Sequence, residues 1–270
     1  MLVGGVHFRP SDPPDLIARK ALRVNLSDLA AMAARPLAYL LTLAVPRGTS
    51  EDFFAALSAG LAADQAAFAV SLLGGDTTAT DGPLTLSVTM IGHVARGGAL
   101  RRLGARPGDG LWVTGTIGDG ALGLAVLSGK LADPSGLLAD RYLLPRPRCA
   151  LNLGGIASAG LDVSDGLVQD VGHLCEVSRV GAVIEAGLVP LSDAARAAGA
   201  AWRETILTGG DDYELAFAVP PGNVPALHAA SAASGIAVTR IGEIVAGSSV
   251  RVTDASGADI RLVRNGWQHF

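Results

Sequence analysis

Short apolar runs in this chain repeatedly end at an aspartate, often beside glycines. The segments that show this pattern carry Asp28, Asp76, Asp162 with Asp165, and Asp211 with Asp212. Glycine lets a ligand approach the backbone closely, and carboxylate oxygens are ligands that Mg²⁺ prefers when it carries phosphates. Four such segments in one chain therefore predict a site in which several metal ions neutralise a polyphosphate.

The bulk properties exclude several classes of protein. The chain has 270 residues, enough for two ordinary domains. Its longest apolar stretch, residues 37–45, is too short to cross a membrane, and residues 1–8 do not resemble a secretory signal. The net charge of −4 gives no basic surface for nucleic acid. Cys149 and Cys175 have no metal-ligand spacing and suggest no disulfide framework, so we expect a cytoplasmic protein.

Helical and strand patterns alternate along the whole chain, which predicts the α/β fold class. The connector at residues 101–109 is basic and contains glycine and proline, so we place a boundary there between domains at 1–104 and 105–270. We expect helices starting near residues 13 (to about 34), 50, 119, 147 (to about 155), 165 and 224, a buried strand at 69–73, and further strands at 40–45, 84–94, 111–114, 213–219, 238–245 and 249–252.

Two common phosphate-binding motifs are weighed separately. No Walker A loop is present, because Lys130 is followed by Leu131 instead of Ser or Thr. A GxGxxG pattern does run from Gly118 to Gly123, after the strand expected at 111–114. No strand ending in an acidic residue follows about 20 residues later, as a dinucleotide site requires. We therefore interpret this pattern as a glycine-rich turn between a strand and a helix.

Six stretches together are far more specific than any one of them. They are Leu-Val-Gly-Gly-Val-His-Phe at 2–8, the segment 20–32 with its Asn-Leu-Ser-Asp-Leu-Ala, Gly-Gly-Asp-Thr-Thr at 74–78, Asp-Val-Ser-Asp-Gly-Leu at 162–167, Gly-Gly-Asp-Asp-Tyr-Glu-Leu at 209–215, and Gly-Trp-Gln-His-Phe at 266–270. In this order they resemble the thiamine-monophosphate kinase family, within the aminoimidazole-ribonucleotide synthetase superfamily. The resemblance covers the whole chain.

The resemblance implies a reaction and an architecture. The family transfers the γ-phosphoryl group of ATP directly to the phosphate of thiamine monophosphate and so forms thiamine diphosphate. Its fold has two α/β (α+β) domains, each a mixed sheet covered by helices, and its N-terminal domains pair into a homodimer. Such a transfer needs positioning and charge neutralisation more than covalent chemistry by the protein, and several Mg²⁺ ions supply the neutralisation.

The resemblance also implies which residues form the site. The metal ligands would be Asp28, Asp76, Asp162 and Asp165. The contacts to ATP would come from Gly75, Asp76, Arg102 and Ser164. The thiamine monophosphate site would be lined by His7, Asp211 and Trp267. The ring of Trp267 suits a flat thiazolium cation, which it attracts through stacking and cation–π interaction.

Two departures from the family pattern stand out. The family carries an N-terminal Gly-Asp-Asp segment and a further aspartate just before the Leu-Val stretch, and both supply metal ligands. The chain that starts at Met1 lacks them, so we expect it to be weakly active or inactive, although still dimeric and able to bind nucleotide. The family also usually has Glu at the positions of Gly5 and Asp211. Asp211 keeps the charge with a shorter reach, whereas Gly5 has no side chain to offer.

Each implied site residue also has an interpretation that needs no ligand. These are a helix surface charge for Asp28, a turn for Asp76, a helix N-cap for Asp162 and Asp165, a connector charge for Arg102, a core or surface position for His7, and a C-terminal anchor for Trp267. The other histidines share no ligand spacing, and we interpret them as structural.

Alternative functions come from two classes. The first comprises other enzymes of the superfamily, namely purine-pathway synthetases, selenophosphate synthetase and the hydrogenase-maturation dehydratase. The last would end in a reactive cysteine, whereas this chain ends in Phe270. The second class is a non-catalytic dimer that binds nucleotide or metal and has lost activity with its N-terminal ligands. The His7–Phe8 pair and the aromatic C-terminal segment favour the thiamine enzyme.

Overall fold

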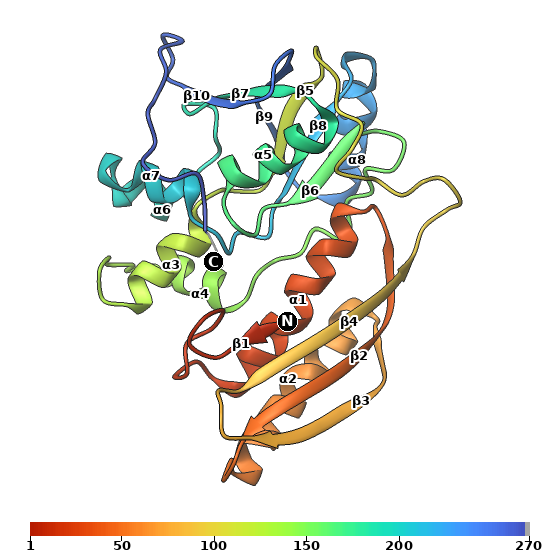
Figure 1. Cartoon of the computed structure of the whole chain (residues 1–270), viewed down its shortest axis with the longest axis vertical. Coiled ribbons are helices and arrows are strands. Elements are labelled where there is room, and N and C mark those ends of the chain that lie inside the picture. The colour runs from red at the N-terminus through yellow and green to blue at the C-terminus, as the bar shows by residue number, and fades with distance from the viewer. Residues whose placement is uncertain (268–270) are drawn as a thin grey trace.

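The computed structural model describes residues 1–267 and contains two sheets with their helices, one following the other along the chain (Figure 1). The N-terminal half contains β1 (Leu2–Val3), α1 (Pro14–Ala31), β2 (Arg35–Pro46), α2 (Glu51–Phe68), β3 (Ser71–Thr80) and β4 (Thr85–His93). The C-terminal half contains β5 (Gly110–Thr114), α3 (Asp119–Leu127), α4 (Leu137–Leu143), β6 (Ala159–Asp162), α5 (Leu167–Ser178), β7 (Gly181–Glu185), α6 (Asp193–Ala198), η1 (Ala200–Trp202), α7 (Arg203–Thr208), β8 (Leu215–Val219), η2 (Pro221–Asn223), α8 (Val224–Ser234), β9 (Val238–Val245) and β10 (Val250–Thr253). No helix in the described part of the chain is long and apolar enough to span a bilayer.

The N-terminal sheet has the strand order β1-β4-β2-β3, with β3 parallel and β4 antiparallel to the central β2. Successive side chains of a strand point to opposite faces, and alternate residues of β2, Tyr39, Leu41 and Leu43, are buried. They join Leu22 and Leu26 of α1 in one hydrophobic core. The helices α1 and α2 therefore cover one face of this sheet (Figure 1).

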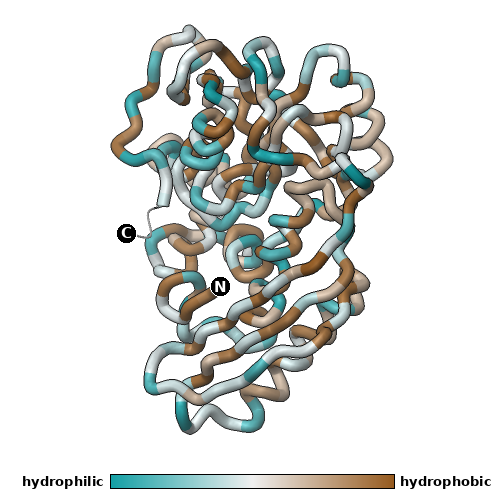
Figure 2. Tube along the Cα trace, turned by 45° about the vertical axis from the view of Figure 1, so that its right-hand side comes forward, coloured by the Kyte–Doolittle hydropathy of each residue, from teal (hydrophilic) through white to brown (hydrophobic). Residues whose placement is uncertain are grey.

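The other face of the N-terminal sheet is open. Leu40 and Thr42 of β2 are exposed there, and apolar residues recur along the long strands of this sheet (Figure 2). The expected buried strand at 69–73 was wrong, because β3 is an edge strand and its residues 71–79 are exposed. Leu73 is 63% exposed. The apolar composition that predicted burial therefore belongs to a surface that this single chain leaves uncovered.

The C-terminal sheet has the order β10-β7-β9-β5-β8-β6, and only β10 and β7 are parallel neighbours. Helices cover both of its faces, as β8 illustrates. Ala216 and Ala218 belong to the core that contains α5, whereas the alternate residue Phe217 belongs to a second core that contains Leu227 of α8. The alternation of side chains along β8 thus contributes residues to two cores, one on each face of the sheet.

Helix α1 joins the two halves. It begins at Pro14, where the fixed φ of proline suits a first helical position, and ends at Ala31. Its middle packs on the N-terminal sheet, while Ala30 and Ala31 pack in a core of the C-terminal half. Arg23 of α1 donates to Asp64 of α2 at 2.6 Å and to the carbonyl of Pro145 at 2.9 Å. The same helix therefore fixes the position of both sheets.

The helix expected at 147–155 is wrong, because this segment is irregular. Leu151 and Leu153 are both buried in the core beside Phe217. Residues two apart on a helix point in nearly opposite directions, so a helix could not bury both. Arg148 is also held by Glu214, to which its Nε donates at 2.6 Å.

Candidate active site

A cleft of about 700 Å³ lies between the two halves, and eight of the ten residues implied by the sequence line it. These are His7, Asp28, Arg102, Asp162, Ser164, Asp165, Asp211 and Trp267. They come from the segment between β1 and α1, from α1, from the connector between the halves, and from three loops or turns of the C-terminal half. Segments from both ends of the chain thus converge on one cavity.

Two carboxyl groups lie near each other where the halves meet. Asp28 belongs to α1, and Asp162 ends β6 and accepts a hydrogen bond of 2.8 Å from the hydroxyl of Ser27. Burial raises the pKa of Asp162 to about 6, and the charge of Asp28 adds to this shift. Burial also raises the pKa of Asp28, against the opposing charge of Arg102. Two such carboxyl groups disfavour their own ionisation, and a cation between them would relieve this cost.

The loop after β6 is shaped by a residue that the sequence analysis missed. One carboxylate oxygen of Asp170 accepts the backbone N–H groups of Ser164, Asp165 and Gly166 at 3.0, 2.9 and 3.1 Å. Asp170 lies in the first turn of α5 and is buried, and burial raises its pKa to about 7. It therefore ties down the loop, while the side chains of Ser164 and Asp165 reach the cleft.

The N-cap interpretation of Asp162 and Asp165 is wrong. The residue at the N-cap of α5 is Gly166, and no side chain at that position caps the helix. A Cβ on Gly166 would lie 2.5 Å from the carbonyl oxygen of Thr208, and its φ of +125° favours glycine. The glycine is needed because the loop passes directly against α7.

The turn before β8 contains three acidic residues, of which only Asp211 lines the cleft. Asp211 has a φ of +70°, which is uncommon for a residue other than glycine, and its N–H donates to the carbonyl of Ser164 at 2.9 Å. Glu214 is fully buried, accepts the hydroxyl of Thr114 at 2.6 Å and pairs with Arg141 at 2.8 Å. This acidic motif therefore combines one side chain that reaches the cleft with internal structural groups.

The third acidic residue, Asp212, explains the GxGxxG pattern. Its two carboxylate oxygens accept the N–H groups of Gly118 and Gly120 at 2.7 and 3.0 Å, at the start of α3. Those are the donors that a dinucleotide site would offer to a pyrophosphate. A carboxylate of the protein already occupies them, which agrees with a glycine-rich turn and not with a dinucleotide site.

The C-terminal tail closes one side of the cleft. The backbone N–H of Trp267 donates to the carbonyl of Asp165 at 2.9 Å, and the side-chain amide of Gln169 donates to the carbonyl of Trp267 at 2.7 Å. The indole is 53% exposed and lines the cleft. The backbone of Trp267 thus anchors the tail beside the cleft. The other residues of the aromatic C-terminal motif, 268–270, lie outside the described residues.

The segment between β1 and α1 contributes His7. Its Nδ1 accepts the N–H of Val3 at 3.0 Å, which fixes the orientation of the ring. Gly5 has a φ of +80°, and no atom lies within 4 Å of the position that its Cβ would take. The space in which the family has a glutamate side chain is therefore open here.

Gly75 and Asp76 are the two implied residues that do not line this cleft. They lie in β3, where they pair with Leu41 and Thr42 of β2. A Cβ on Gly75 would lie 1.7 Å from the carbonyl oxygen of Leu41, so its glycine has a structural cause. Asp76 pairs with Thr42, so the two residues lie on the same, open face of the sheet, and Asp76 belongs to the exposed part of β3.

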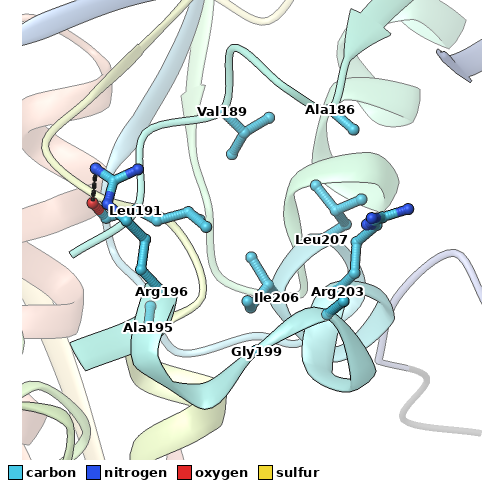
Figure 3. Close-up of a pocket in the computed structure, with 10 residues that line it drawn as sticks. Ala186, Val189, Leu191, Ala195, Arg196, Gly199, Arg203, Ile206 and Leu207 are labelled. Carbon is cyan, nitrogen blue, oxygen red and sulfur yellow. Dashed lines mark hydrogen bonds between the residues drawn. The ribbon is translucent and has the colours of Figure 1, made fainter. Parts of the chain in front are cut away.

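A second cavity, of about 220 Å³, contains none of the implied residues (Figure 3). Ile206 and Leu207 of α7 line it, whereas Thr205 and Gly209 line the cleft, so α7 separates the two cavities. Figure 3 shows apolar side chains around its interior, with Arg196 and Arg203 at the sides. It lacks the carboxylates that phosphate-bound metal requires, and the large cleft remains the candidate site.

The side chains of the large cleft were tested for their fit to a metal ion that carries phosphates. In residues 1–267, no three His, Cys, Asp or Glu side chains converge as a ready-made metal cage. Mg²⁺ typically takes one or two carboxylates and fills its shell with water and substrate phosphates. The Asp28 and Asp162 carboxyls fit that pattern, and Arg102 adds a fixed positive charge near both.

Sequence profiles of two domains match the chain. The profile described as AIR synthase related protein, N-terminal domain, matches residues 1–94. The corresponding C-terminal domain profile matches residues 106–255. The two matches cover the two sheets described above.

Curated relatives are similar along the whole chain. The thiamine-monophosphate kinase of Caulobacter vibrioides is 42% identical over 99% of this chain and 78% of its own length. The enzyme of the same name from Escherichia coli K12 is 40% identical over the full chain and 84% of its own length.

Solved structures agree in fold. A thiamine-monophosphate kinase from Stenotrophomonas maltophilia has a TM-score of 0.85 at 42% identity, over 93% of this chain and 82% of its own. AaThiL in complex with AMPPCP and TMP has a TM-score of 0.87 at 30% identity, over 100% of this chain and 85% of its own. The hydrogenase maturation protein HypE, at 18% identity and a TM-score of 0.76, shares the fold alone.

Proposed function

The chain belongs to the thiamine-monophosphate kinase family, and we propose that it transfers the γ-phosphoryl group of ATP to the phosphate of thiamine monophosphate. A phosphate oxygen of thiamine monophosphate attacks the γ-phosphorus, and the bond from that phosphorus to the β–γ bridging oxygen breaks. The products are thiamine diphosphate and ADP. The observation that carries this proposal is the convergence of eight implied site residues on one cleft of about 700 Å³.

We propose that the cleft binds ATP through its phosphates. Ser164 lies in a loop whose N–H groups are already held by Asp170, so the loop is fixed before nucleotide binds. Arg102 lines the same cleft and offers a guanidinium that suits phosphate oxygens. A preformed loop and a fixed charge favour the alignment that phosphoryl transfer requires.

Mg²⁺ fits the carboxyl groups of the cleft, and we propose Asp28, Asp162 and Asp165 as ligands there. Bound Mg²⁺ would neutralise the phosphate oxygens between which the phosphoryl group moves. Burial raises the pKa values of both Asp28 and Asp162, and the charge of Asp28 adds to the shift of Asp162. A bound cation would offset this cost of ionisation, which supports the role proposed for the two carboxyl groups. Ser27 holds one oxygen of Asp162 and so orients the other toward a ligand.

The acceptor would bind at the end of the cleft that contains His7, Asp211 and Trp267. The Nε2–H of His7 is a suitable donor to the acceptor phosphate, because Nδ1 already accepts from the backbone of Val3. The exposed ring of Trp267 offers a flat face to the thiazolium cation. Asp211 supplies the negative charge that complements the same cation.

We propose that two copies pair through the open face of the N-terminal sheet. Leu40 of β2 is exposed on that face, Leu72 and Leu73 of the neighbouring strand β3 are exposed as well, and β3 is a ten-residue edge strand. Long apolar edges associate unless they are covered, and a second copy would cover this one. Gly75 and Asp76 lie in the same strand, so in the dimer they would complete the nucleotide and metal site from that face.

Two coarser proposals accompany the function. We place the boundary between the domains at residues 104 and 105, within the connector that links the two sheets. We also propose that the protein works in the cytoplasm, where ATP and thiamine phosphates occur together, and that it binds neither nucleic acid nor membrane.

Calorimetry with thiamine monophosphate tests the proposed function. The acceptor should bind in the presence of Mg²⁺ and the ATP analogue AMPPCP, and thiamine, which lacks the phosphate, should bind much more weakly. Equal affinity for the two would show that no acceptor-phosphate site exists. Binding is measured without turnover, so the result does not depend on the rate of phosphoryl transfer.

A further inference from the structure

Lys20 stands out because it is a buried cation at the junction of the two halves. The chain has only two lysines, Lys20 and Lys130, among 21 basic residues. Lys130 is exposed, whereas Lys20 lies in α1 and is 2% exposed. A buried ammonium group is costly unless a negative charge or another strong partner faces it. The partner of Lys20 therefore indicates its role.

The charged partner of Lys20 is Asp211, in the C-terminal half. The Nζ of Lys20 lies 3.1 Å from Oδ1 of Asp211 as an ion pair, without the angles of a hydrogen bond. The same Nζ lies 3.7 Å from the ring centroid of Tyr142 in α4, a distance typical of cation–π attraction. A carboxylate and an aromatic ring thus enclose the ammonium group within the described part of the chain.

Asp211 interacts with a second side chain as well. The side chain of Tyr213 lies close enough to Asp211 for the two to interact electrostatically, and Tyr213 also has a positive φ, of +52°. Burial and the charge of Asp211 raise the pKa of Tyr213 well above its usual value, so it remains neutral. The side chain of Asp211 is 26% exposed and lines the cleft. The carboxylate of Asp211 is therefore held by Lys20 on the protein side, while part of it faces the cavity.

We propose that Lys20 is a positioning residue for the acceptor, and that it acts through Asp211. This inference rests on the proposed function, in which Asp211 contacts thiamine monophosphate. Lys20 fixes one carboxylate oxygen, so the other faces the ligand without a loss of side-chain freedom on binding. Because Lys20 belongs to α1, the same ion pair sets how the N-terminal half meets the acceptor end of the cleft.

Lysine suits this position better than arginine. Its ammonium is a compact point charge, whereas a guanidinium is a planar fork that needs several acceptors in its plane. The space beside Tyr142 and Asp211 offers one carboxylate oxygen at 3.1 Å and one ring face at 3.7 Å. A single charged point at the end of an apolar stem fits that arrangement.

The decisive test compares Asp211→Asn with the double variant Lys20→Met/Asp211→Asn. The double variant removes both members of the ion pair, so, unlike Asp211→Asn, it leaves no buried ammonium group without its carboxylate partner. If Lys20 acts through Asp211, the two variants bind thiamine monophosphate within about twofold of each other. Lys20→Met alone should weaken thiamine monophosphate binding by about 10- to 100-fold, with little change for AMPPCP. Lys130→Met, the same substitution at an exposed site, is the matched control and should match wild type.

Three results would count against these claims in distinguishable ways. A further loss of about tenfold in the double variant relative to Asp211→Asn would show that Lys20 does not act through Asp211. Equal losses for thiamine monophosphate and AMPPCP in Lys20→Met would show a general structural role and would also overturn the inference. If the wild-type chain fails to bind thiamine monophosphate, the proposed function fails and this inference fails with it.

Discussion

The hydroxyl of Ser27 donates a hydrogen bond of 2.8 Å to Oδ2 of Asp162 and so links α1 to the end of β6. Ser27 belongs to the N-terminal half and Asp162 to the C-terminal half, so the bond forms only when the two halves are packed together. The bond lowers the pKa of Asp162 against burial and the charge of Asp28, which together raise it to about 6. The ionisation of a proposed metal ligand is therefore set by how the two halves meet.

The first prediction concerns pH. Because the pKa of Asp162 is raised to about 6, its carboxyl is protonated below that pH and must lose a proton to bind Mg²⁺. The Mg²⁺ concentration that gives half-maximal activity should therefore rise as pH falls from 7.5 to 5.5. Ser27→Ala removes the bond that lowers this pKa, so the midpoint of the rise should move to higher pH. A Mg²⁺ requirement that does not change with pH would contradict the role given to Asp162.

A second prediction concerns the residue on the open sheet face. Asp76→Asn keeps the shape of the side chain and removes the charge that Mg²⁺ needs, so phosphoryl transfer should fall below detection while the melting temperature stays near that of wild type. Asp81→Asn, the same substitution at an exposed position just beyond the same strand, is the control and should retain activity. Near wild-type activity of Asp76→Asn at limiting Mg²⁺ would remove Asp76 from the metal site.

A third prediction is that substitution of Trp267 affects the binding of one substrate and not of the other. Trp267→Ala should weaken thiamine monophosphate binding by about 1–2 kcal/mol, because the ring covers a desolvated cation, and should leave AMPPCP binding nearly unchanged. Calorimetry of both ligands measures the difference. Equal losses for both would mean that Trp267 only anchors the tail, to which its backbone bonds with Asp165 and Gln169 already contribute.

The stability of the N-terminal half should depend on one buried carboxylate. Asp64 is fully buried and pairs with Arg19 at 3.0 Å and Arg23 at 2.6 Å. Asp64→Ala leaves the buried guanidinium of Arg23 without its partner, so the free energy of unfolding should fall by about 3 kcal/mol or more. Asp81→Ala breaks the exposed pair with Arg47 and should cost less than about 1 kcal/mol. Equal effects in chemical denaturation would contradict this account.

Sequence patterns predicted the parts of the site that are local. The segment around Asp162 and the turn around Asp211 each combine a strand end with glycines, and the structure places both in the cleft. Close backbone approach explains those glycines, since a Cβ on Gly210 would lie 2.3 Å from the carbonyl oxygen of Ser164. A motif of this kind is visible in sequence because its cause is only a few residues long.

The supporting residues could not be predicted because their roles depend on contacts between distant segments. Asp170 looks like an ordinary acidic residue in a first helical turn, a position that generally favours negative charge. Lys20 looks like a surface residue of an amphipathic helix until Asp211, from the other half, lies 3.1 Å from it. The signal available for Lys20 was its rarity in a chain that otherwise uses arginine.

The exposed strand β3 shows a different limit of prediction from sequence. Its apolar residues predict burial, but a sequence pattern alone does not distinguish burial within one chain from burial by the second copy that we propose. For the irregular segment around Leu151, Pro147 and Gly154–Gly155 predicted the two ends of a helix that the structure does not contain. Its apolar residues are spaced to fill a gap between a sheet and α1, and no regular period describes that gap.

The most direct test of the central claim follows the transferred phosphoryl group. The protein is incubated with Mg²⁺, thiamine monophosphate and ATP labelled in the γ-phosphoryl group, and the thiamine phosphates are separated by chromatography. We predict thiamine diphosphate that carries the label in its terminal phosphate, with one ADP formed for each molecule. Release of the label as inorganic phosphate, with no labelled thiamine diphosphate at any time point, would contradict the claim that this cleft passes the group directly from ATP to thiamine monophosphate.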